Sequence, residues 1–226
     1  MKVIVFGASG MVGQGALREC VADAQVESVL AVVRAPTGRA GGKVSELVHD
    51  DFTDFSGVQD KLAGFDACFF CLGVSSAGMS EADYRKVTYD YALAAAQALV
   101  KVNPGMTFIY VSGEGTDASE QGPSMWARVK GQTENALLKL PFKAAYMFRP
   151  GFIKPGPGIV SKTGLYRFFY AVTAPLYPVF RALAPKVVTT TEEVGRAMLS
   201  VAKRGAPARV LRSDEIRAAA SIPSAT

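Results

Sequence analysis

The feature that most constrains the fold is a glycine-rich turn close to the start of the chain. Residues Lys2–Phe6 predict a short buried strand, which is followed directly by Gly7, Ala8, Ser9, Gly10, Met11, Val12 and Gly13. In such a turn the first glycine allows a tight bend, the second lets the backbone approach a pyrophosphate, and the third lets the helix pack closely on the strand. The pattern predicts a dinucleotide-binding unit with phosphates at the helix N-terminus; a glycine-rich turn without a ligand is the alternative.

The rest of residues 1–150 alternates short apolar runs with helical patterns. The predicted strands are Lys2–Phe6, Ser28–Val33, Glu46–Val48, Asp66–Leu72, Thr107–Ser112 and Ala144–Phe148. The predicted helices are Met11–Ala22, Phe55–Leu62, Glu81–Val102 and Ser124–Leu140. Continuously apolar strands separated by helices predict an α/β fold, a doubly wound parallel β-sheet with helices on both faces.

The pattern changes after residue 148, where prolines and glycines interrupt it. An aromatic helical segment is predicted at Gly164–Leu183 and a further helix at Thr191–Lys203. We expect a single domain over residues 1–226, with residues 149–185 as a substrate-side or lid insertion. The aromatic residues of this insertion are Tyr166, Phe168, Phe169, Tyr170, Tyr177 and Phe180. Core packing is the simplest interpretation of these residues; a substrate pocket, a dimer interface and a membrane-surface contact are the alternatives.

The charge of the chain is unevenly distributed. The formal net charge is +5, and residues 139–226 contain 14 Lys and Arg against 4 Asp and Glu. A basic segment with aromatic helices is suited to anionic lipid or acidic partners. The charges are dispersed and no recognition motif is present, which argues against nucleic acid. The expected partner is an unidentified small-molecule substrate, with a membrane surface and a homodimer as further interpretations.

Composition excludes several classes of protein. With 49% hydrophobic and 20% charged residues, the chain is expected to be folded. A single histidine, His49, excludes a metal site built from several histidines. Cys20, Cys68 and Cys71 are too few for a disulfide framework or a four-cysteine zinc site, and the apolar run around Cys68 and Cys71 predicts buried thiols. Unpaired cysteines without an export signal predict a cytoplasmic location.

The residue after the second strand bears on the choice of cofactor. NAD-binding proteins usually carry an acid there for the ribose 2′-hydroxyl, whereas this chain has Arg34, with Arg39 and Lys43 nearby. A guanidinium can pair bidentately with a 2′-phosphate, so NADP(H) is preferred over NAD(H). A solvated basic loop that accepts either cofactor is the alternative.

Together, several motifs resemble the atypical branch of the short-chain dehydrogenase/reductase superfamily, and in particular the Tat-interacting-protein-30-like NAD(P)-binding proteins. The motifs are Gly7–Gly13, Cys71-Leu72-Gly73, Val111-Ser112, Arg128-Val129-Lys130-Gly131 and Phe148-Arg149-Pro150-Gly151. The resemblance runs from Lys2 to about Arg204 and implies a Rossmann fold related to the NAD-dependent epimerases and dehydratases.

The resemblance also implies roles for individual residues. Leu72, Gly73 and Val74 would line the nicotinamide ribose, and Asp51 with Phe52 would lie beside the adenine. The residues implied for the nicotinamide amide are Pro150, Gly151, Phe152 and Ile153. Cys71, Val111 and Ser112 are included in the cofactor site because they belong to the matching motifs.

Family members assist hydride transfer with a Tyr-x-x-x-Lys pair and a preceding serine. Lys130 and Ser112 match the lysine and a serine, and Lys130 is also expected to bind the nicotinamide ribose. Trp126 occupies the tyrosine position, and its indole N–H cannot usefully transfer a proton near neutral pH. Gly113 stands where many relatives have a second serine. The candidate substitute acids are Tyr84, Tyr89, Tyr91 and Tyr110, and no spacing rule selects one of them.

The sequence therefore predicts an NADP(H)-binding protein of the atypical short-chain type. One interpretation is an oxidoreductase acting on a small carbonyl or quinone-like substrate with an incomplete catalytic set. The alternative is a non-catalytic NADP(H)-binding sensor or protein-interaction module, associated with a membrane surface in one version of this hypothesis.

Overall fold

Seven parallel strands form one open sheet at the centre of the computed structural model, which describes residues 1–159 and 188–222. The strands are β1 (Lys2–Phe6), β2 (Ser28–Val33), β3 (Val44–Val48), β4 (Ala67–Phe70), β5 (Thr107–Val111), β6 (Ala144–Arg149) and β9 (Val210–Arg212). Their order is β3-β2-β1-β4-β5-β6-β9, and every neighbouring pair is parallel. The winding reverses between β1 and β4, which confirms the doubly wound fold and marks the edge where ligands of such sheets bind.

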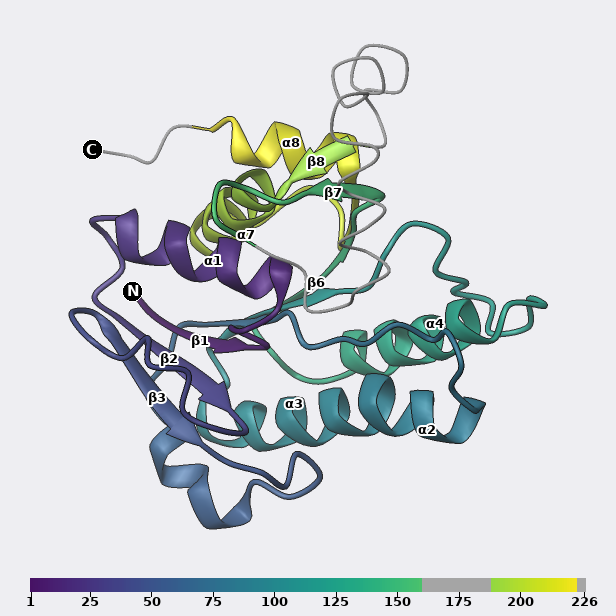
Figure 1. The fold of residues 1–226 in the computed structure, drawn as a ribbon, viewed down its shortest axis with the longest axis horizontal. Helices are drawn as coiled ribbons and strands as arrows, with labels where there is room; N and C mark the ends of the chain where they lie inside the picture. Colours follow the sequence, from purple (N-terminus) through teal and green to yellow (C-terminus); the bar gives the residue numbers. More distant parts are fainter. Residues whose placement is uncertain (160–187, 223–226) are drawn as a thin grey trace.

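Helices cover both faces of the sheet (Figure 1). On one face lie α1 (Met11–Ala22), α7 (Thr191–Arg204) and α8 (Ser213–Ala220). On the other lie the 3-10 helix η1 (Ser56–Leu62), α2 (Glu81–Arg85), the π-helical η2 (Lys86–Asp90), α3 (Tyr91–Val102) and α4 (Met125–Leu138). Alternate residues of each strand supply the two cores: Val3 and Val5 pack in the core with α1 and α7, whereas Ile4 and Phe6 pack in the core with α3.

Glycines allow α1 and α7 to cross closely. A Cβ atom on Gly15 would lie 2.5 Å from the carbonyl oxygen of Thr191, and one on Gly195 would lie 2.8 Å from Cγ of Glu19. A capping box starts α7, in which the Glu193 amide donates to the Thr190 hydroxyl at 3.1 Å and the Thr190 amide donates to the Glu193 carboxylate at 2.8 Å. This packing orients α1, whose N-terminus carries the glycine-rich turn.

Several elements differ from the sequence expectation. The predicted helix Glu81–Val102 contains a π-helical turn, and the predicted helix Phe55–Leu62 is a 3-10 helix. No element was expected where β9 and α8 lie, nor where β7 (Phe152–Lys154) and β8 (Val188–Thr190) form a separate two-stranded parallel sheet. Strands of three residues are too short to show a hydrophobic period, so their pairing depends on tertiary contacts.

Most of the predicted insertion over residues 149–185 lies outside the described residues, and so do all six of its aromatic residues. Its first part, up to residue 159, follows β6 and includes β7. Within the described ranges, none of the helices combines the length and apolar character needed to cross a membrane.

Candidate functional site

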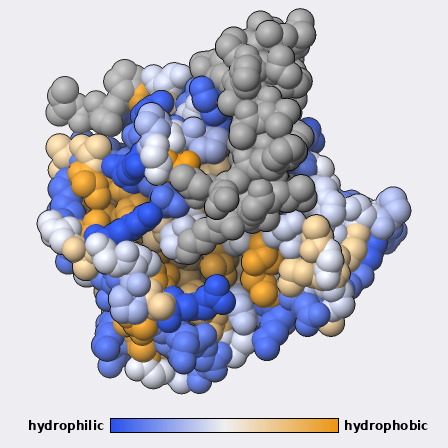
Figure 2. Space-filling view, viewed as in Figure 1, coloured by the Kyte–Doolittle hydropathy of each residue, from blue (hydrophilic) through white to orange (hydrophobic). Residues whose placement is uncertain are grey.

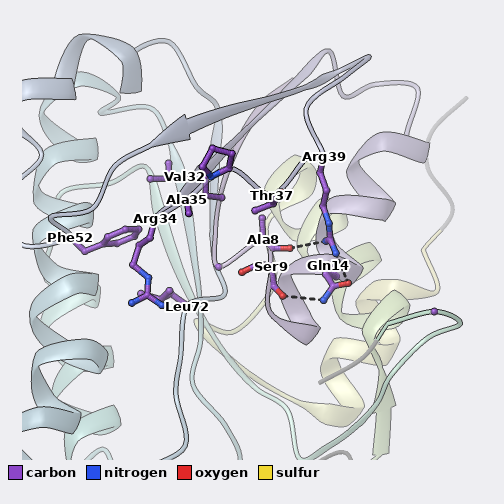
Figure 3. Close-up of a pocket in the computed structure, with 14 residues that line it drawn as sticks. Ala8, Ser9, Gln14, Val32, Arg34, Ala35, Thr37, Arg39, Phe52 and Leu72 are labelled. Carbon is purple, nitrogen blue, oxygen red and sulfur yellow. Dashed lines mark hydrogen bonds between the residues drawn. The ribbon is translucent and has the colours of Figure 1, made fainter. Parts of the chain in front are cut away.

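A cavity of about 600 Å³ opens at the carboxyl ends of β1 and β2 (Figure 3). Its lining comes from the glycine-rich turn, the loop after β2 and the ends of neighbouring segments: Gly7, Ala8, Ser9, Gln14, Val32, Val33, Arg34, Ala35, Pro36, Thr37, Arg39, Phe52, Leu72 and Gly158. Figure 2 shows apolar side chains at the surface between the layer of α1 and the layer of α3, bordered by hydrophilic ones. The volume is typical of a site for a small molecule or cofactor.

The glycine-rich turn has the geometry that its sequence predicts. Gly7 has a φ of +74°, and a Cβ atom there would lie 2.7 Å from the backbone of Cys71. The amide of Gly10 donates to the carbonyl of Gly7 at 2.8 Å. A Cβ atom on Gly13 would overlap the carbonyl oxygen of Gly7, so the helix can approach the strand only without a side chain there. The backbone of the turn therefore borders the cavity directly.

Two arginines lie on opposite sides of the cavity. In Figure 3 Arg34 extends towards Leu72, near Phe52, whereas Arg39 extends towards the glycine-rich turn. The Arg39 guanidinium donates to the Ala8 carbonyl at 3.2 Å and to the Gln14 side-chain oxygen at 2.9 Å. The cavity is therefore bordered by two cations as well as by backbone amides.

Two other charged residues near the second and third strands are directed elsewhere. Lys43 donates to the carbonyl of Asp23 at 2.8 Å, beyond the C-terminal end of α1, and is not a lining residue. Asp51 is also not a lining residue: its carboxylate accepts from the Thr53 amide at 2.9 Å, and hydrogen bonds from Thr53 hold its pKa below the usual value. Of the Asp51–Phe52 pair, the phenyl ring is the part that reaches the cavity.

The residues predicted for the nicotinamide half lie beyond this lining, except for Leu72. They are Cys71, Gly73, Val74, Val111, Ser112, Lys130, Pro150, Gly151, Phe152 and Ile153. The Gly151 amide donates to the Ser213 hydroxyl at 2.9 Å, and the Pro150 carbonyl accepts from the Glu114 amide at 2.9 Å. These bonds tie the chain after β6 to α8 and to the loop after β5.

A polar cluster lies at the ends of β5 and β6, around one face of α4. The Lys130 ammonium group donates to the carbonyl of Ser112, and the Ser112 hydroxyl donates to the Glu134 carboxylate at 2.5 Å. Glu134 is buried and pairs with Arg149, whose Nε lies 3.0 Å and 3.1 Å from the two carboxylate oxygens. Burial lowers the pKa of Lys130 to about 8, against the opposing effect of the Glu134 charge.

Trp126 and Gly113 flank this cluster. A Cβ atom on Gly113 would lie 3.7 Å from Nζ of Lys130, so the missing side chain leaves space beside the ammonium group. The indole of Trp126 packs on the same loop, since a Cβ atom on Gly115 would lie 3.1 Å from its ring. Trp126, Lys130 and Glu134 follow each other at intervals of four residues along α4 and therefore share one face of that helix.

The four candidate tyrosines lie in different environments. Tyr84 and Tyr110 are buried in the core, and burial raises the pKa of Tyr110 above its usual value. The ring of Tyr89 lies under the Arg85 guanidinium, at 4.0 Å. Tyr91 packs beside Phe52, with ring centroids 5.8 Å apart. Burial of Tyr84 and Tyr110 removes them as acids that a substrate reaches directly.

Cysteine and histidine chemistry plays no visible part in the site. All three cysteines are free, Cys20 and Cys68 are buried, and burial raises the pKa of each thiol above its usual value, for Cys20 to about 12. His49 follows β3, where its Nε2 lies 2.8 Å from the Asp54 carbonyl oxygen and its ring packs on Phe55. The prediction of a buried thiol is confirmed for Cys68, whereas Cys71 is only partly buried.

The sequence did not predict several residues of the site, among them four with polar or charged side chains that the structure brings into it. Gln14 and Thr37 line the cavity, and Glu134 with Arg149 supports Ser112 and Lys130. The spacing of Glu134 four residues after Lys130 was an available signal, because it places both on one helix face. Gln14 and Thr37 carried no such signal, since their roles depend on where the loop after β2 folds back.

Curated relatives in several organisms match the chain. The Botryotinia fuckeliana protein "Botcinic acid biosynthesis cluster B protein 16" is 32% identical over 151 residues, 59% of this chain and 92% of that protein. "Protein FMP52-1, mitochondrial" of Scheffersomyces stipitis is 28% identical over 155 residues, 68% of this chain and 67% of that protein. "Protein HTATIP2" of Rattus norvegicus is 27% identical over 171 residues, 71% of this chain and 69% of that protein. No protein-family model matches the chain.

Solved structures match over nearly the whole chain. An oxidoreductase of the short-chain dehydrogenase/reductase family from Burkholderia thailandensis superposes with a TM-score of 0.67 at 16% identity, covering 96% of this chain and 92% of that one. The chain therefore belongs to the same protein family as the Botryotinia fuckeliana relative, and its fold is that of the short-chain dehydrogenase/reductase structures. A further member of this fold, MoeE5 in complex with UDP-glucose and NAD, superposes with a TM-score of 0.68 at 16% identity, covering 94% of this chain and 75% of that one.

The names of four of the relatives correct one expectation. The FMP52 relatives, of which the alignments cover about two thirds, are named mitochondrial proteins, so the expected cytoplasmic location is wrong. Free cysteines are compatible with any reducing compartment, so they do not distinguish the cytoplasm from the interior of an organelle.

Proposed function

We propose that this short-chain dehydrogenase/reductase relative binds NADP(H) in the cavity beside its glycine-rich turn and acts as an oxidoreductase on a small carbonyl or quinone-like substrate. The observation that carries the proposal is a single cavity bordered by the turn at the start of α1 and by two arginines. The pyrophosphate of a dinucleotide would lie against the glycine-rich turn, and the 2′-phosphate of NADP(H) would lie near the two arginines.

The N-terminus of α1 fits a phosphate group. Its N-cap residue is Gly10, no side chain caps the first turn, and that turn contains no acidic residue. Helix N-termini leave backbone amides without intrahelical partners, and the helix dipole favours an anion there. The NAD bound by MoeE5, a protein of the same fold, supports a dinucleotide as the occupant.

The proposed division of the cofactor follows from where the residues lie. Phe52 and Leu72 offer apolar contacts for the adenine side, and Arg34 and Arg39 offer positive charge for the 2′-phosphate. Lys130 is proposed to hold the nicotinamide ribose, with Ser112 and Glu134 fixing its position. The bound cofactor supplies or accepts a hydride.

Proton transfer is where the chain departs from its family. Trp126 stands four residues before Lys130, where a tyrosine acid would stand, and its indole N–H can orient a substrate oxygen but not protonate it. Loss of a positioned acid typically slows a reaction by about 10²–10⁴-fold. We therefore propose a slow reductase, or one whose acceptor needs little acid assistance, such as a quinone.

Calorimetric titration with NADPH and NADH tests the cofactor proposal. We expect micromolar binding of NADPH and about tenfold weaker binding of NADH, a difference of about 1.4 kcal/mol. Exchange of Arg34 for Met should reduce this ratio. Equal affinity for both cofactors would contradict the NADP(H) preference, and no binding of either would contradict the proposed function.

The position of Trp126 supports a second candidate, a non-catalytic NADP(H) sensor. NADPH consumption with a broad panel of carbonyls and quinones separates the two. Turnover above the blank for any substrate, lost in a Lys130→Met variant, supports the reductase. Tight cofactor binding without turnover across the panel supports the sensor.

A further inference from the structure

One carboxylate ties the loop after β2 to the neighbouring strand. Glu46 lies on β3, next to Ala31 of β2 in the sheet register. Its side chain accepts the amide of Thr37 at 3.0 Å and the hydroxyl of the same residue, and the amide of Arg39 lies 3.4 Å from it. These hydrogen bonds hold the pKa of Glu46 below its usual value. The loop that carries Arg39 is therefore held to β3 by hydrogen bonds to Glu46.

The side chain of Arg39 is anchored from the opposite side. Its guanidinium donates to the Ala8 carbonyl and to the Gln14 side chain, and Gln14 in turn donates to the Ser9 carbonyl at 3.1 Å. Figure 3 shows this arrangement at the edge of the cavity. A guanidinium has five N–H donors, of which these bonds use two. The cation is thus held in one place with donors left for an anion.

We propose that Glu46 is a positioning residue that gives the cavity its preference for a 2′-phosphorylated adenine nucleotide by holding Arg39 in place. The inference rests on the proposed cofactor function, which assigns this cavity to a dinucleotide. Arg34 and Arg39 border the cavity from the adenine side and the phosphate side, and the adenosine ribose of a dinucleotide lies between these two groups.

The carboxylate itself does not serve as the ribose ligand. An acid near the end of β2 would favour the 2′-hydroxyl of NAD(H), but Glu46 is not a lining residue, and both of its oxygens accept hydrogen bonds from the loop. Its effect on an anion is therefore indirect. A mobile arginine side chain loses conformational entropy when it binds a ligand. A side chain that is already held in place before binding avoids this entropic cost.

Glu46 can affect the affinity for an anion in two ways, through its negative charge and through the position of Arg39, and the two predict opposite changes in affinity when Glu46 is replaced. If Glu46 acted only through its charge, its removal would strengthen the binding of any anion. If it positions Arg39, its removal weakens the binding of a 2′-phosphate selectively. The probes are 2′,5′-ADP and 5′-AMP, which differ by that phosphate, titrated into the full chain by calorimetry.

For Glu46→Gln we expect the affinity for 2′,5′-ADP to fall about five- to tenfold while the affinity for 5′-AMP changes less than twofold. The matched control is Asp50→Asn, which removes one negative charge just after β3 and should leave both affinities unchanged or slightly higher. In an Arg39→Met background, Glu46→Gln should have no further effect, because both changes act on one interaction. Thr37→Val should give a smaller loss in the same direction.

The outcomes separate the inference from the function on which it rests. If the unmodified protein binds neither probe, the cofactor proposal fails. If it binds 2′,5′-ADP more tightly than 5′-AMP and Glu46→Gln leaves that ratio unchanged or raises it, the positioning role of Glu46 is overturned. If Glu46→Gln lowers both affinities equally or fails to fold, the Thr37→Val variant decides: an unchanged ratio overturns the inference, and a reduced ratio supports it.

Discussion

At the scale of single residues, the chemistry of Lys130 depends on neighbours that are distant in sequence. Its ammonium group contacts the Ser112 carbonyl from β5, and the buried Glu134–Arg149 pair lies behind it. A buried ion pair contributes little net stability, but removing one partner leaves a buried charge and is costly. We therefore interpret the pair as support for the lysine and the serine rather than as a source of stability.

The titration of Lys130 should be visible in the stability of the protein. Burial lowers its pKa from 10.5 to about 8, so between these values the unfolded chain binds more protons than the folded one. The free energy of unfolding should then rise with pH through this window, by up to about 3 kcal/mol, and the cost of burying the charge is fully present below pH 8. Lys130→Met should remove that rise, as measured by urea unfolding at pH 7 and pH 10.

Lys139→Met is the control for this measurement, because Lys139 is exposed at the end of the same helix. It should keep the pH dependence of the unmodified protein. A Lys130→Met variant with the same pH dependence as the unmodified protein would show that the buried ammonium group is not the source.

At the scale of elements, the crossing of α1 and α7 holds the glycine-rich turn in place. The contact depends on backbone approach rather than on side-chain packing, because Gly15 lies against the carbonyl of Thr191. The sequence predicted both helices almost to the residue, since α1 begins directly after the glycine-rich turn and Thr190 with Glu193 caps the start of α7. It did not predict their contact, which joins residues almost 180 positions apart.

Gly15→Ala should destabilise the protein although alanine favours helices. The new methyl group would lie 2.5 Å from a backbone oxygen that cannot rotate away, so α1 and α7 must separate. We expect a loss of about 1–3 kcal/mol in the free energy of unfolding, larger than the gain of about 1 kcal/mol from helix propensity. Gly57→Ala, where an added Cβ meets nothing within 4 Å, should be neutral or slightly stabilising in the same urea titration.

At the scale of the whole molecule, the predicted fold class, a doubly wound parallel sheet, agrees with the structure because the strand pattern leaves few choices. Continuously apolar strands require helices on both faces, and β1 supplies both cores by simple alternation. The sequence did not predict short elements near the C-terminal end, such as β9. Val210–Arg212 forms a strand because it can pair with the edge of β6. The carboxyl edge of the completed sheet then gathers the candidate site from many segments.

Charge at this scale leads to a separate expectation. Residues 139–226 carry 14 basic against 4 acidic side chains. If this excess attracts anionic lipid, the protein should co-sediment with phosphatidylserine vesicles at low salt and be released at about 0.5 M salt, where the Debye length is only a few ångströms. Equal sedimentation with neutral phosphatidylcholine vesicles, or none with either, would contradict a membrane-surface role.

The sequence by itself determined the doubly wound sheet and the glycine-rich turn, because these depend on local periodicity and spacing. It also showed that Arg34, Lys130 and Trp126 stand at positions where residue type bears on cofactor binding and proton transfer. Tertiary structure decided which charges share a site. It directed Arg39 to the cavity and Lys43 away from it, and it placed Glu46, Glu134 and Arg149 behind the residues they hold. The physical reason is that hydrogen bonds and ion pairs act over a few ångströms in space, and only folding brings distant parts of the chain within that range.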